Sequence, residues 1–524
     1  MTAALAYERR WKTLRVLALS LVIIGLDNTI LNVALPSLQE HFDASSSTLQ
    51  WMVDSYLVSF AGLLLTLGML GDRFGRKRAL QTGIALFGLS SLAVLFVETS
   101  TQLIAVRALM GVGGAMIMPA TLSIITNVFP REERAKAIGV WAGTAAIGVG
   151  LGPLFGGLLL EYFDWSSVFL VNVPVALVAF VLGLRFVPDS RDPHPGRFDV
   201  PGALLSIGAL VALIYAVIEA PERGWLDPVI LGAFGAALAL AAAFVAWELR
   251  TASPMLDLRL FRNPRFSIAS LSISLAFFSL FGAIFALTQF LQFAKDYSPL
   301  QAGAAMVPLA FGLMLGATRS AKAAERVGTR RVVAGGLIGL GITLTTTLLW
   351  TSDMPYWPIG LWFFFGALSM GCVMGPATSS VMGAVPKEKA GVASAMNDVT
   401  RQVGGSLGTA VIGSLVTSFY GSRVSDAASG LPSGARSAVK DSIGSADAVA
   451  AQLPADQGAS LSHAAASAFS DALGLGLCAA AIAALAAAVI VIRRLPAREA
   501  VSAPVEGPGE PVRLNQPREL PSAA

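Results

Sequence analysis

Three charged residues lie within apolar stretches of the sequence that are otherwise almost free of charge. Asp27 lies in the first stretch, within residues 25–36 (GLDNTILNVALP), Asp54 lies in the second and Arg107 in the fourth. A carboxylate inside a lipid-spanning helix costs roughly 2.5–3.5 kcal/mol even on lenient insertion scales, so its presence indicates a function. Burial raises the pKa of a carboxylate and a nearby Arg lowers it, so one carboxylate can bind either a proton or a cation.

We therefore interpret Asp27 and Arg107 as a proton-coupling pair, and Asp27 and Asp54 as binding residues for a cationic substrate. Each residue also has a structural alternative. These alternatives are a hydrogen bond to a helix terminus for Asp27, a hydrated interfacial position for Asp54 and pairing with backbone carbonyls for Arg107. Counting along the helices at about 1.5 Å per residue puts all three charges in the same half of the membrane.

Aromatic side chains near these charges are further candidates, because flat cations stack on aromatic faces. Trp51 and Tyr56 flank Asp54, and Trp141 lies in the fifth apolar stretch. We predict that these three aromatic residues contact the substrate, although packing and interface belts account for most aromatic residues in membrane proteins.

Another charged pair lies in the apolar stretch 391–420. Asp398 and Arg401 are three residues apart, which places them on one face of a helix. We interpret the pair as part of a gate. The alternative is a second proton-binding or substrate-binding carboxylate at Asp398.

Composition excludes an ordinary soluble protein and any evident catalytic or metal centre. Of the 524 residues, 55% are hydrophobic and 13% are charged, whereas soluble domains have about 25% charged residues. The two cysteines lie in apolar stretches, and the three histidines show no metal-ligand spacing. The sequence contains no GxxxxGK[ST] loop, which disfavours an ATP-driven pump. We therefore expect no enzyme activity, no cofactor and no metal.

Apolar windows of about 20 residues predict an all-α membrane protein with fourteen transmembrane helices that position these residues. The predicted helices span 14–35, 50–70, 79–97, 102–128, 136–160, 167–187, 200–220, 228–247, 266–293, 300–318, 332–350, 356–385, 391–420 and 472–492.

The distribution of basic residues predicts the orientation of the chain. With the N-terminus inside, 30 of the 37 Lys and Arg residues fall on the cytoplasmic side, five fall outside and two lie within helices. Cytoplasmic loops carry such an excess. We therefore expect both termini to be cytoplasmic in a multi-pass protein of the inner membrane. The basic isoelectric point, near 9.1, then reflects the basic cytoplasmic segments, and we expect no nucleic-acid partner.

An internal repeat predicts the domain organisation. The loop sequences LGDRFGRKRAL (70–80) and AAERVGTRRVV (323–333) share the pattern acid–Arg–x–Gly–x–basic–basic. Eight helices separate them, so the repeats run parallel, a known transporter plan. We predict an N-terminal six-helix bundle at 1–190, an inserted helix pair at 191–250 and a C-terminal six-helix bundle at 251–495. An outside loop at 421–468 holds two short amphipathic stretches, and 496–524 is expected to be a disordered tail.

Two glycine-rich segments have structural requirements of their own. In the first loop Gly71 and Gly75 permit a tight turn, and Asp72 can pair with basic residues or cap a helix N-terminus. Anchoring of the topology is the alternative role of this loop. In 148–157 (GVGLGPLFGG) glycines recur every four residues, so one helix face is small enough for a second helix to approach closely. The residues that we assign to this packing motif are Gly148, Gly152, Pro153, Gly156 and Gly157.

Four of these segments resemble signatures of the major facilitator superfamily. They are 68–80 (GMLGDRFGRKRAL), 103–115 (LIAVRALMGVGGA), 148–157 and 25–36, the last being similar to the fourteen-helix drug:proton antiporter branch. The segment 51–56 (WMVDSY) is similar to exporters of quaternary ammonium compounds. One departure is Ser166 in WSSVFLVNVP (165–174), where the family has Arg.

The resemblance implies a proton-coupled antiporter that exports hydrophobic, cationic drugs or antibiotics. A symporter, or an exporter of one metabolite, is the alternative. The expected partners are a small-molecule drug, protons and the lipid bilayer, and the expected state is a monomer. The resemblance also implies that the loop at 68–80 locks a cytoplasmic gate. The gating residues that we predict are Gly68, Asp72, Arg73, Gly75, Arg76, Glu325, Arg326, Asp398 and Arg401.

Overall fold

The computed structural model describes residues 7–42, 44, 46–192, 199–251, 254, 256, 258–386 and 389–496. Helices dominate this part of the chain, which contains no strand. The long helices are α2 (Arg10–Phe42), α3 (Ser46–Phe74), α4 (Arg76–Ala93), α5 (Ser100–Val128), α6 (Arg131–Tyr162), α8 (Asn172–Phe186), α9 (Val200–Arg223), α10 (Pro228–Glu248), α11 (Pro264–Gln289), α13 (Val307–Val327), α14 (Thr329–Thr345), α15 (Tyr356–Gly383), α16 (Ala390–Val424) and α19 (Ala455–Arg494).

The expected all-α membrane fold is confirmed. Thirteen helical segments among the described residues are long and apolar enough to cross a membrane. A helix satisfies all of its backbone hydrogen bonds internally, which is the requirement that lipid imposes. The predicted span 136–160 lies in α6, a helix of 32 residues that is not one of those thirteen segments. The predicted span 167–187 is divided between α7 (Ser167–Leu170) and α8.

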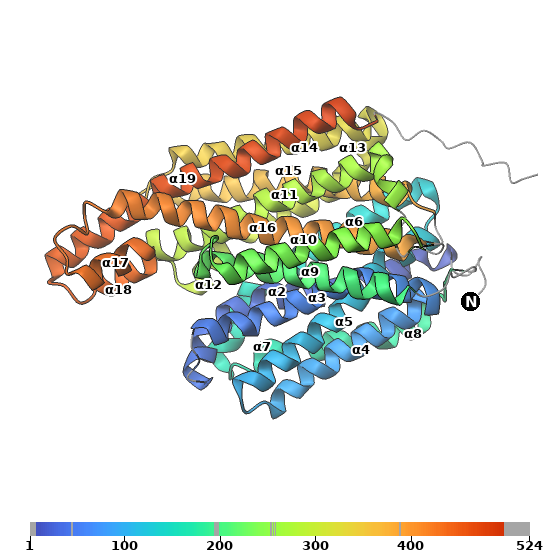
Figure 1. Ribbon diagram of the computed structural model, residues 1–524, viewed down its shortest axis with the longest axis horizontal. Helices are drawn as coiled ribbons and strands as arrows, with labels where there is room; N and C mark the ends of the chain where they lie inside the picture. The colour runs from blue at the N-terminus through green and yellow to red at the C-terminus, as the bar shows by residue number, and fades with distance from the viewer. Residues whose placement is uncertain are drawn as a thin grey trace, which may run out of the picture.

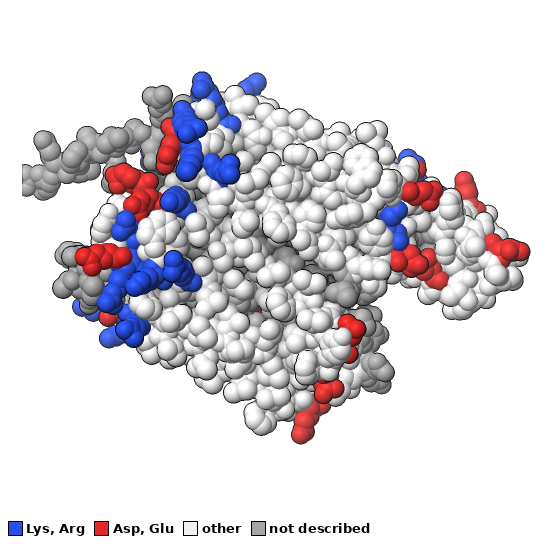
Figure 2. All heavy atoms as spheres, turned by 180° about the vertical axis from the view of Figure 1, so that it is seen from behind, with Lys and Arg blue, Asp and Glu red and all other residues white. Residues whose placement is uncertain are grey.

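On the face that Figure 2 shows, charged residues gather at the two ends of the helical bundle and leave a broad uncharged band between them. Lys and Arg side chains concentrate at the end where α2 begins and α19 finishes, which we call the basic end. The opposite end, which we call the far end, carries the short helices α17 (Ser433–Asp441) and α18 (Ile443–Ala450) (Figure 1). An uncharged band of this kind suits contact with the acyl chains of a bilayer.

Two sets of helices pack internally and then against each other. In the first set α2 packs on α6, and α5 packs on both α3 and α4. In the second set α13 packs on α15, α11 on α16, and α14 on α19. The sets meet where α16 contacts α3 and α5, and where α6 contacts α13 and α15. Helices α9 and α10 pack on each other at the outside of the bundle, and α9 also contacts α3 and α16 (Figure 1).

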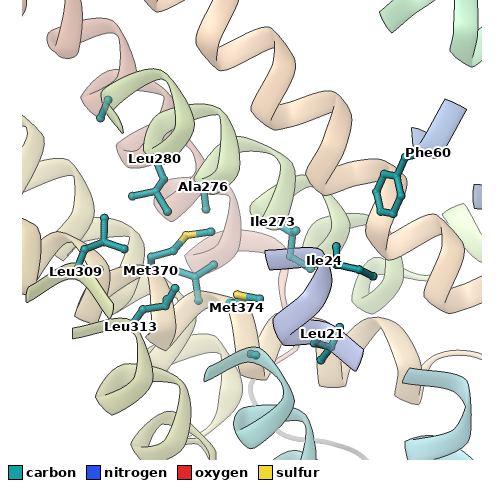
Figure 3. Packing of buried hydrophobic residues seen from close by; sticks show 14 of the residues in the cluster. Leu21, Ile24, Phe60, Ile273, Ala276, Leu280, Leu309, Leu313, Met370 and Met374 are labelled. Atoms are coloured by element: carbon teal, nitrogen blue, oxygen red, sulfur yellow. The ribbon is translucent and has the colours of Figure 1, made fainter. Parts of the chain in front are cut away.

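Buried apolar side chains fill the region where the two sets meet. Figure 3 shows Ile24 of α2 near Ile273 of α11, with Met374 of α15 and Leu313 of α13 beyond them. Because Met is unbranched and flexible, it fills irregular gaps between helices. The core is therefore continuous from the first set to the second.

Two glycines in corresponding positions of the sequence repeat separate consecutive helices. Gly75 lies between α3 and α4 with φ 119°, and Gly328 lies between α13 and α14 with φ 90°. Side chains other than hydrogen are disfavoured at such positive φ values. The turn predicted for Gly75 thus has the backbone conformation that glycine provides.

The far end contains a helical hairpin formed by the end of α16, the helices α17 and α18, and the start of α19. The two short helices lie within the stretch 421–468, where two amphipathic segments are expected. The π-helical turn η3 (Phe290–Ala294) contacts both α18 and α19, so the hairpin is packed on the bundle. The tail predicted at 496–524 lies outside the described residues, apart from Pro496.

Candidate functional site

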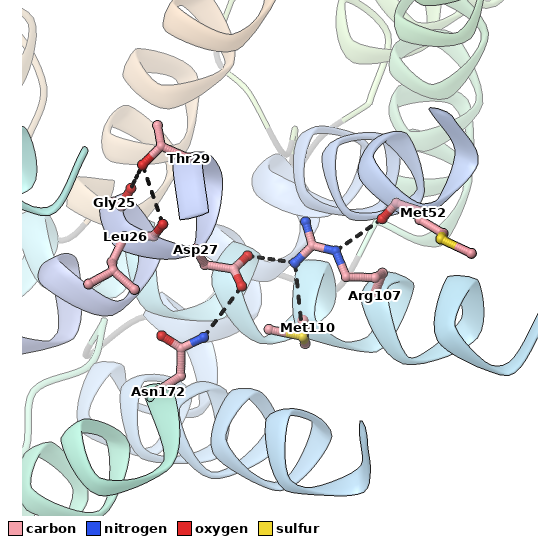
Figure 4. A network of polar contacts seen from close by, with 8 residues as sticks. All are labelled: Gly25, Leu26, Asp27, Thr29, Met52, Arg107, Met110 and Asn172. Carbon is pink, nitrogen blue, oxygen red and sulfur yellow. Dashed lines mark hydrogen bonds and ion pairs between the residues drawn. The ribbon is translucent and has the colours of Figure 1, made fainter. Parts of the chain in front are cut away.

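A buried ion pair joins α2 to α5. The Arg107 Nη1 atom donates a 2.6 Å hydrogen bond to Oδ2 of Asp27, and each residue is 1% exposed (Figure 4). Inside a bundle the desolvation cost of two charges is offset only when they pair closely. The structure therefore brings together the two residues that the sequence assigns to proton coupling.

Further groups hold both members of this pair in place. The Nε of Arg107 donates to the Met52 carbonyl oxygen at 3.1 Å, and its guanidinium carbon lies 4.6 Å from the ring centre of Tyr56. Asn172 of α8 donates through Nδ2 to the second carboxylate oxygen of Asp27 at 3.4 Å (Figure 4). Arg107 thus keeps contacts of its own on α3.

Asn172 and Met52 contact the ion pair, and the sequence interpretation missed both. Asn172 is a single polar residue within an apolar run, with Val171 before it and Val173 after it. An isolated amide inside a spanning helix is costly for the same reason as an isolated carboxylate, so this signal was available. Met52 acts through its backbone, which no side-chain pattern reveals.

Asp54 and Trp51 lie on α3, within two residues of Met52, whose carbonyl oxygen accepts from Arg107. The Asp54 side chain is buried. Trp51 packs against the ring of Tyr215 on α9, with 6.1 Å between ring centres. Trp51 therefore joins α3 to α9, and the structure gives it a packing contact.

A second buried charge cluster is formed by side chains of α16, α6, α11 and α15. The guanidinium carbon of Arg401 is 4.7 Å from the ring centre of Trp141 and 5.5 Å from that of Phe277 on α11. Its Nη2 donates to Thr378 Oγ1 on α15 at 3.1 Å, and its Nη1 lies 3.8 Å from Oδ1 of Asp398. Residues that the sequence assigns to two different roles, gating and substrate contact, thus form one cluster.

The Asp72 carboxylate links the two sets of helices at the basic end. It pairs with Arg76 Nε at 2.7 Å and accepts hydrogen bonds from the amides of Gly391 at 2.7 Å and Val392 at 3.3 Å. These amides belong to the first turn of α16, so an anion lies at the positive end of a helix dipole. Gly68 packs beside it, where an added Cβ would lie 2.8 Å from the Gly391 carbonyl oxygen. Helices α3 and α16 are therefore in close contact at the basic end.

The second copy of the loop does not form this contact. Glu325 and Arg326 are exposed in the last turn of α13, and Glu325 has no hydrogen bond or ion pair within the part of the chain that the structure describes. Arg73 is half-buried, with its guanidinium carbon 5.6 Å from the centre of the Phe74 ring. The structure thus gives Asp72 and Glu325 different surroundings despite their equivalent places in the repeat.

The glycine face of α6 packs on the segment of α2 that carries Asp27. A Cβ on Gly148 would lie 2.8 Å from the Val22 carbonyl oxygen, and one on Gly156 would lie 3.0 Å from Cγ1 of Ile30. Gly152 lies between them, against Ile30 and the carbonyl of Leu26. The helix runs on through Pro153, and Gly157 is half-buried. Close approach of α6 therefore fixes the place of α2 beside Arg107.

No group of three or more His, Cys, Asp or Glu side chains within the described ranges is arranged to hold a metal ion.

Residues 17–409 match the sequence profile described as Major Facilitator Superfamily. The chain belongs to the major facilitator superfamily. Membership makes it a multi-pass membrane transporter and not an enzyme.

Curated relatives within the superfamily cover nearly the whole chain. The multidrug efflux pump LfrA of Mycolicibacterium smegmatis is 39% identical over 484 residues, which are 92% of this chain and 96% of that protein. The tetracenomycin C resistance and export protein of Streptomyces glaucescens is 34% identical, with 95% and 94% covered. The methyl viologen resistance protein SmvA of Salmonella typhimurium is 35% identical, with 88% and 93% covered.

Two solved transporter structures share the fold at low sequence identity. The human organic anion transporter MFSD10 (TETRAN) has a TM-score of 0.59 at 14% identity, covering 90% of this chain and 98% of that chain. A bacterial homologue of the human lysosomal transporter Spinster has a TM-score of 0.55 at 18% identity, covering 93% and 97%.

Proposed function

We propose that this protein is a proton-coupled antiporter that exports hydrophobic, cationic drugs or antibiotics. The observation that carries the proposal is the buried pair of Asp27 and Arg107 inside an apolar bundle. The names of the relatives, which describe multidrug efflux and resistance to drugs, support the substrate class.

The architecture proposed for this function has fourteen transmembrane helices. Two parallel six-helix bundles, at 1–190 and 251–495, surround the transport path. Helices α9 and α10 are inserted between the two bundles in the sequence. The 32-residue length of α6 supports its inclusion as a spanning helix. The concentration of Lys and Arg at the basic end supports cytoplasmic termini in the inner membrane. A monomer suffices, because the two bundles of one chain enclose the path.

The proposed coupling step is exchange of a proton for the cationic drug at Asp27. While Asp27 is ionised it holds Arg107 and α5 against α2. A proton that binds Asp27 neutralises the carboxylate and releases this attraction. Since protonation favours one arrangement of helices and cation binding favours the other, the two ligands occupy the site in alternation.

The same cycle requires a gate that opens and closes at the basic end. The contact of Asp72 with the start of α16, which lies close to α3, supports a gate that is closed at the basic end. Opening requires loss of the hydrogen bonds to Gly391 and Val392. The proton gradient supplies enough energy, since one charge crossing 100 mV yields about 2.3 kcal/mol.

The test is dye movement in proteoliposomes that contain the purified protein and ethidium. For an antiporter, a lumen made more acidic than the outside drives ethidium into the lumen, and a protonophore abolishes this accumulation. Accumulation under the opposite gradient would identify a symporter. Movement of ethidium that ignores both gradients would refute proton coupling.

A further inference from the structure

The Arg401 side chain lies against aromatic rings from both sets of helices. Trp141 belongs to α6 and Phe277 belongs to α11, and the guanidinium carbon lies 4.7 Å and 5.5 Å from their ring centres. Such distances allow cation–π attraction, which is strongest when water is excluded. Arg401 is 6% exposed, so the contact is made in the interior.

The charges in this cluster are poorly paired compared with those of Asp27 and Arg107. The nearest approach of Arg401 Nη1 to Asp398 is 3.8 Å, whereas the other pair is at 2.6 Å. The Nε of Arg401 and the Oδ2 of Asp398 are both buried without a hydrogen-bond partner. Asp398 is 3% exposed. Apart from the 3.8 Å approach of Arg401, its Oδ1 atom accepts a 3.4 Å hydrogen bond from Asn397 Nδ2. An incompletely satisfied buried carboxylate has a strong affinity for a better-placed cation.

The ring of Trp141 is held in place independently of Arg401. Its Nε1 donates a 3.0 Å hydrogen bond to Thr121 Oγ1 of α5. The aromatic wall therefore keeps its orientation when the guanidinium moves away. Thr378, which binds both Arg401 Nη2 and Asn397, gives the guanidinium a polar partner on α15.

We infer that Arg401 is a tethered cation that occupies a substrate subsite formed by Trp141, Phe277 and Asp398. A guanidinium is planar and carries a delocalised charge. The subsite therefore fits flat aromatic monocations with delocalised charge. The incoming cation stacks on the two rings, displaces Arg401 and takes Asp398 as its counter-ion. This inference rests on the proposed export of cationic drugs and names the class of cation.

The test is equilibrium binding of ethidium, a flat monocation, to the purified full-length protein in detergent, with no gradient present. Replacing Arg401 by Gln removes the competing cation, so the dissociation constant for ethidium should fall about tenfold. Binding of Nile red, a neutral dye, should not change. Arg401→Lys keeps a competing cation and should bind ethidium like the parent protein. Arg223→Gln, which removes an exposed partner of Glu219 at the far end, is the matched control.

Two further variants test the walls of the subsite. Asp398→Asn and Phe277→Leu should each weaken ethidium binding about tenfold, and each should cancel the gain of Arg401→Gln. These variants also decide the matter if Arg401→Gln does not fold. Equal changes for ethidium and Nile red, or unchanged ethidium binding in Asp398→Asn and Phe277→Leu, would overturn the inference. Neither result would affect the gradient-driven transport that tests the proposed function, whose failure requires that ethidium ignore the proton gradient.

Discussion

The carboxylate of Asp72 accepts a 2.7 Å hydrogen bond from the backbone amide of Gly391, which lies 319 residues later in the chain. This contact joins the last part of α3 to the first turn of α16 at the basic end. Because Asp72 also pairs with Arg76, one buried carboxylate connects a loop signature, a helix terminus and both sets of helices.

Replacement of Asp72 by Asn should loosen the basic end. Hydrogen bonds to a charged group contribute about 1.5–3 kcal/mol, and the amide loses that charge. A single cysteine placed at Ala395, which packs on Gly68 and is fully buried, should then react about tenfold faster with a hydrophilic maleimide. The measurement uses a background in which Cys372 and Cys478 are replaced by Ser.

The matched variant for this experiment is Glu325→Gln in the second copy of the loop. Glu325 is exposed and has no described partner, so the reactivity at position 395 should stay at the parent level. An equal acceleration in both variants would contradict a lock formed by Asp72 alone.

Replacement of Asp27 by Asn should abolish proton-driven ethidium movement and lower stability. Removing one member of a buried pair leaves Arg107 unpaired, at a cost of about 3–5 kcal/mol. The double variant Asp27→Asn with Arg107→Gln should recover thermal stability but not transport. Recovery of transport in the double variant would make the pair purely structural. Asp471→Asn, which breaks an exposed ion pair with Arg423, should change neither property.

Replacement of Gly152 by Ala should destabilise the contact between α2 and α6. The new methyl group would lie 3.0 Å from both the Ile30 nitrogen and the Leu26 oxygen, and such overpacking costs about 1–3 kcal/mol. Gly232→Ala in α10 meets nothing within 4 Å, so it should gain up to about 1 kcal/mol from helix propensity. Thermal unfolding in detergent compares the two variants, and equal melting temperatures would count against the packing role of Gly152.

The far-end hairpin should become less stable as the pH rises. Burial raises the pKa of the Asp447 carboxyl above its ordinary value, a hydrogen bond from Ser462 opposes this, and nearby Asp296 raises it further. The folded hairpin therefore binds a proton more tightly than the unfolded chain does. Its stabilisation is complete below the unfolded pKa and is lost as the pH rises through the raised pKa.

Amide hydrogen exchange in α18 measures this effect after correction for the intrinsic exchange rate. Protection should be greater near pH 4 than near pH 8. Asp447→Asn should remove the dependence, whereas Asp471→Asn should retain it. A parent-like dependence in Asp447→Asn would exclude Asp447 as its source.

Much of the fold could be predicted from the sequence, because lipid allows few solutions. The length of an apolar run sets a helix, and opposite charges within lipid must meet, so the contact of Asp27 with Arg107 follows from their types and depths. The rotation and tilt of each helix are set by packing with its neighbours. For that reason neither Asn172 beside Asp27 nor Trp141 beside Arg401 could be deduced from a linear pattern.

The repeat also shows where a sequence pattern stops being informative. Asp72 and Glu325 occupy equivalent positions, and the sequence predicts the same gating role for both. Of these two residues only Asp72 reaches a helix terminus in this structure, whereas Glu325 is exposed. A pattern of residues describes what a loop can bind and not when it does so.

The length of α19 has a practical consequence. Its 40 residues extend about 60 Å at about 1.5 Å per residue, twice the roughly 30 Å of a bilayer's hydrocarbon layer. A helix of this length extends beyond the hydrocarbon layer, and at the far end α18 packs on α19 and α17 packs on α18. This far-end hairpin is therefore a suitable epitope for an antibody fragment. A bound fragment would add mass and define the orientation of the particle in electron microscopy.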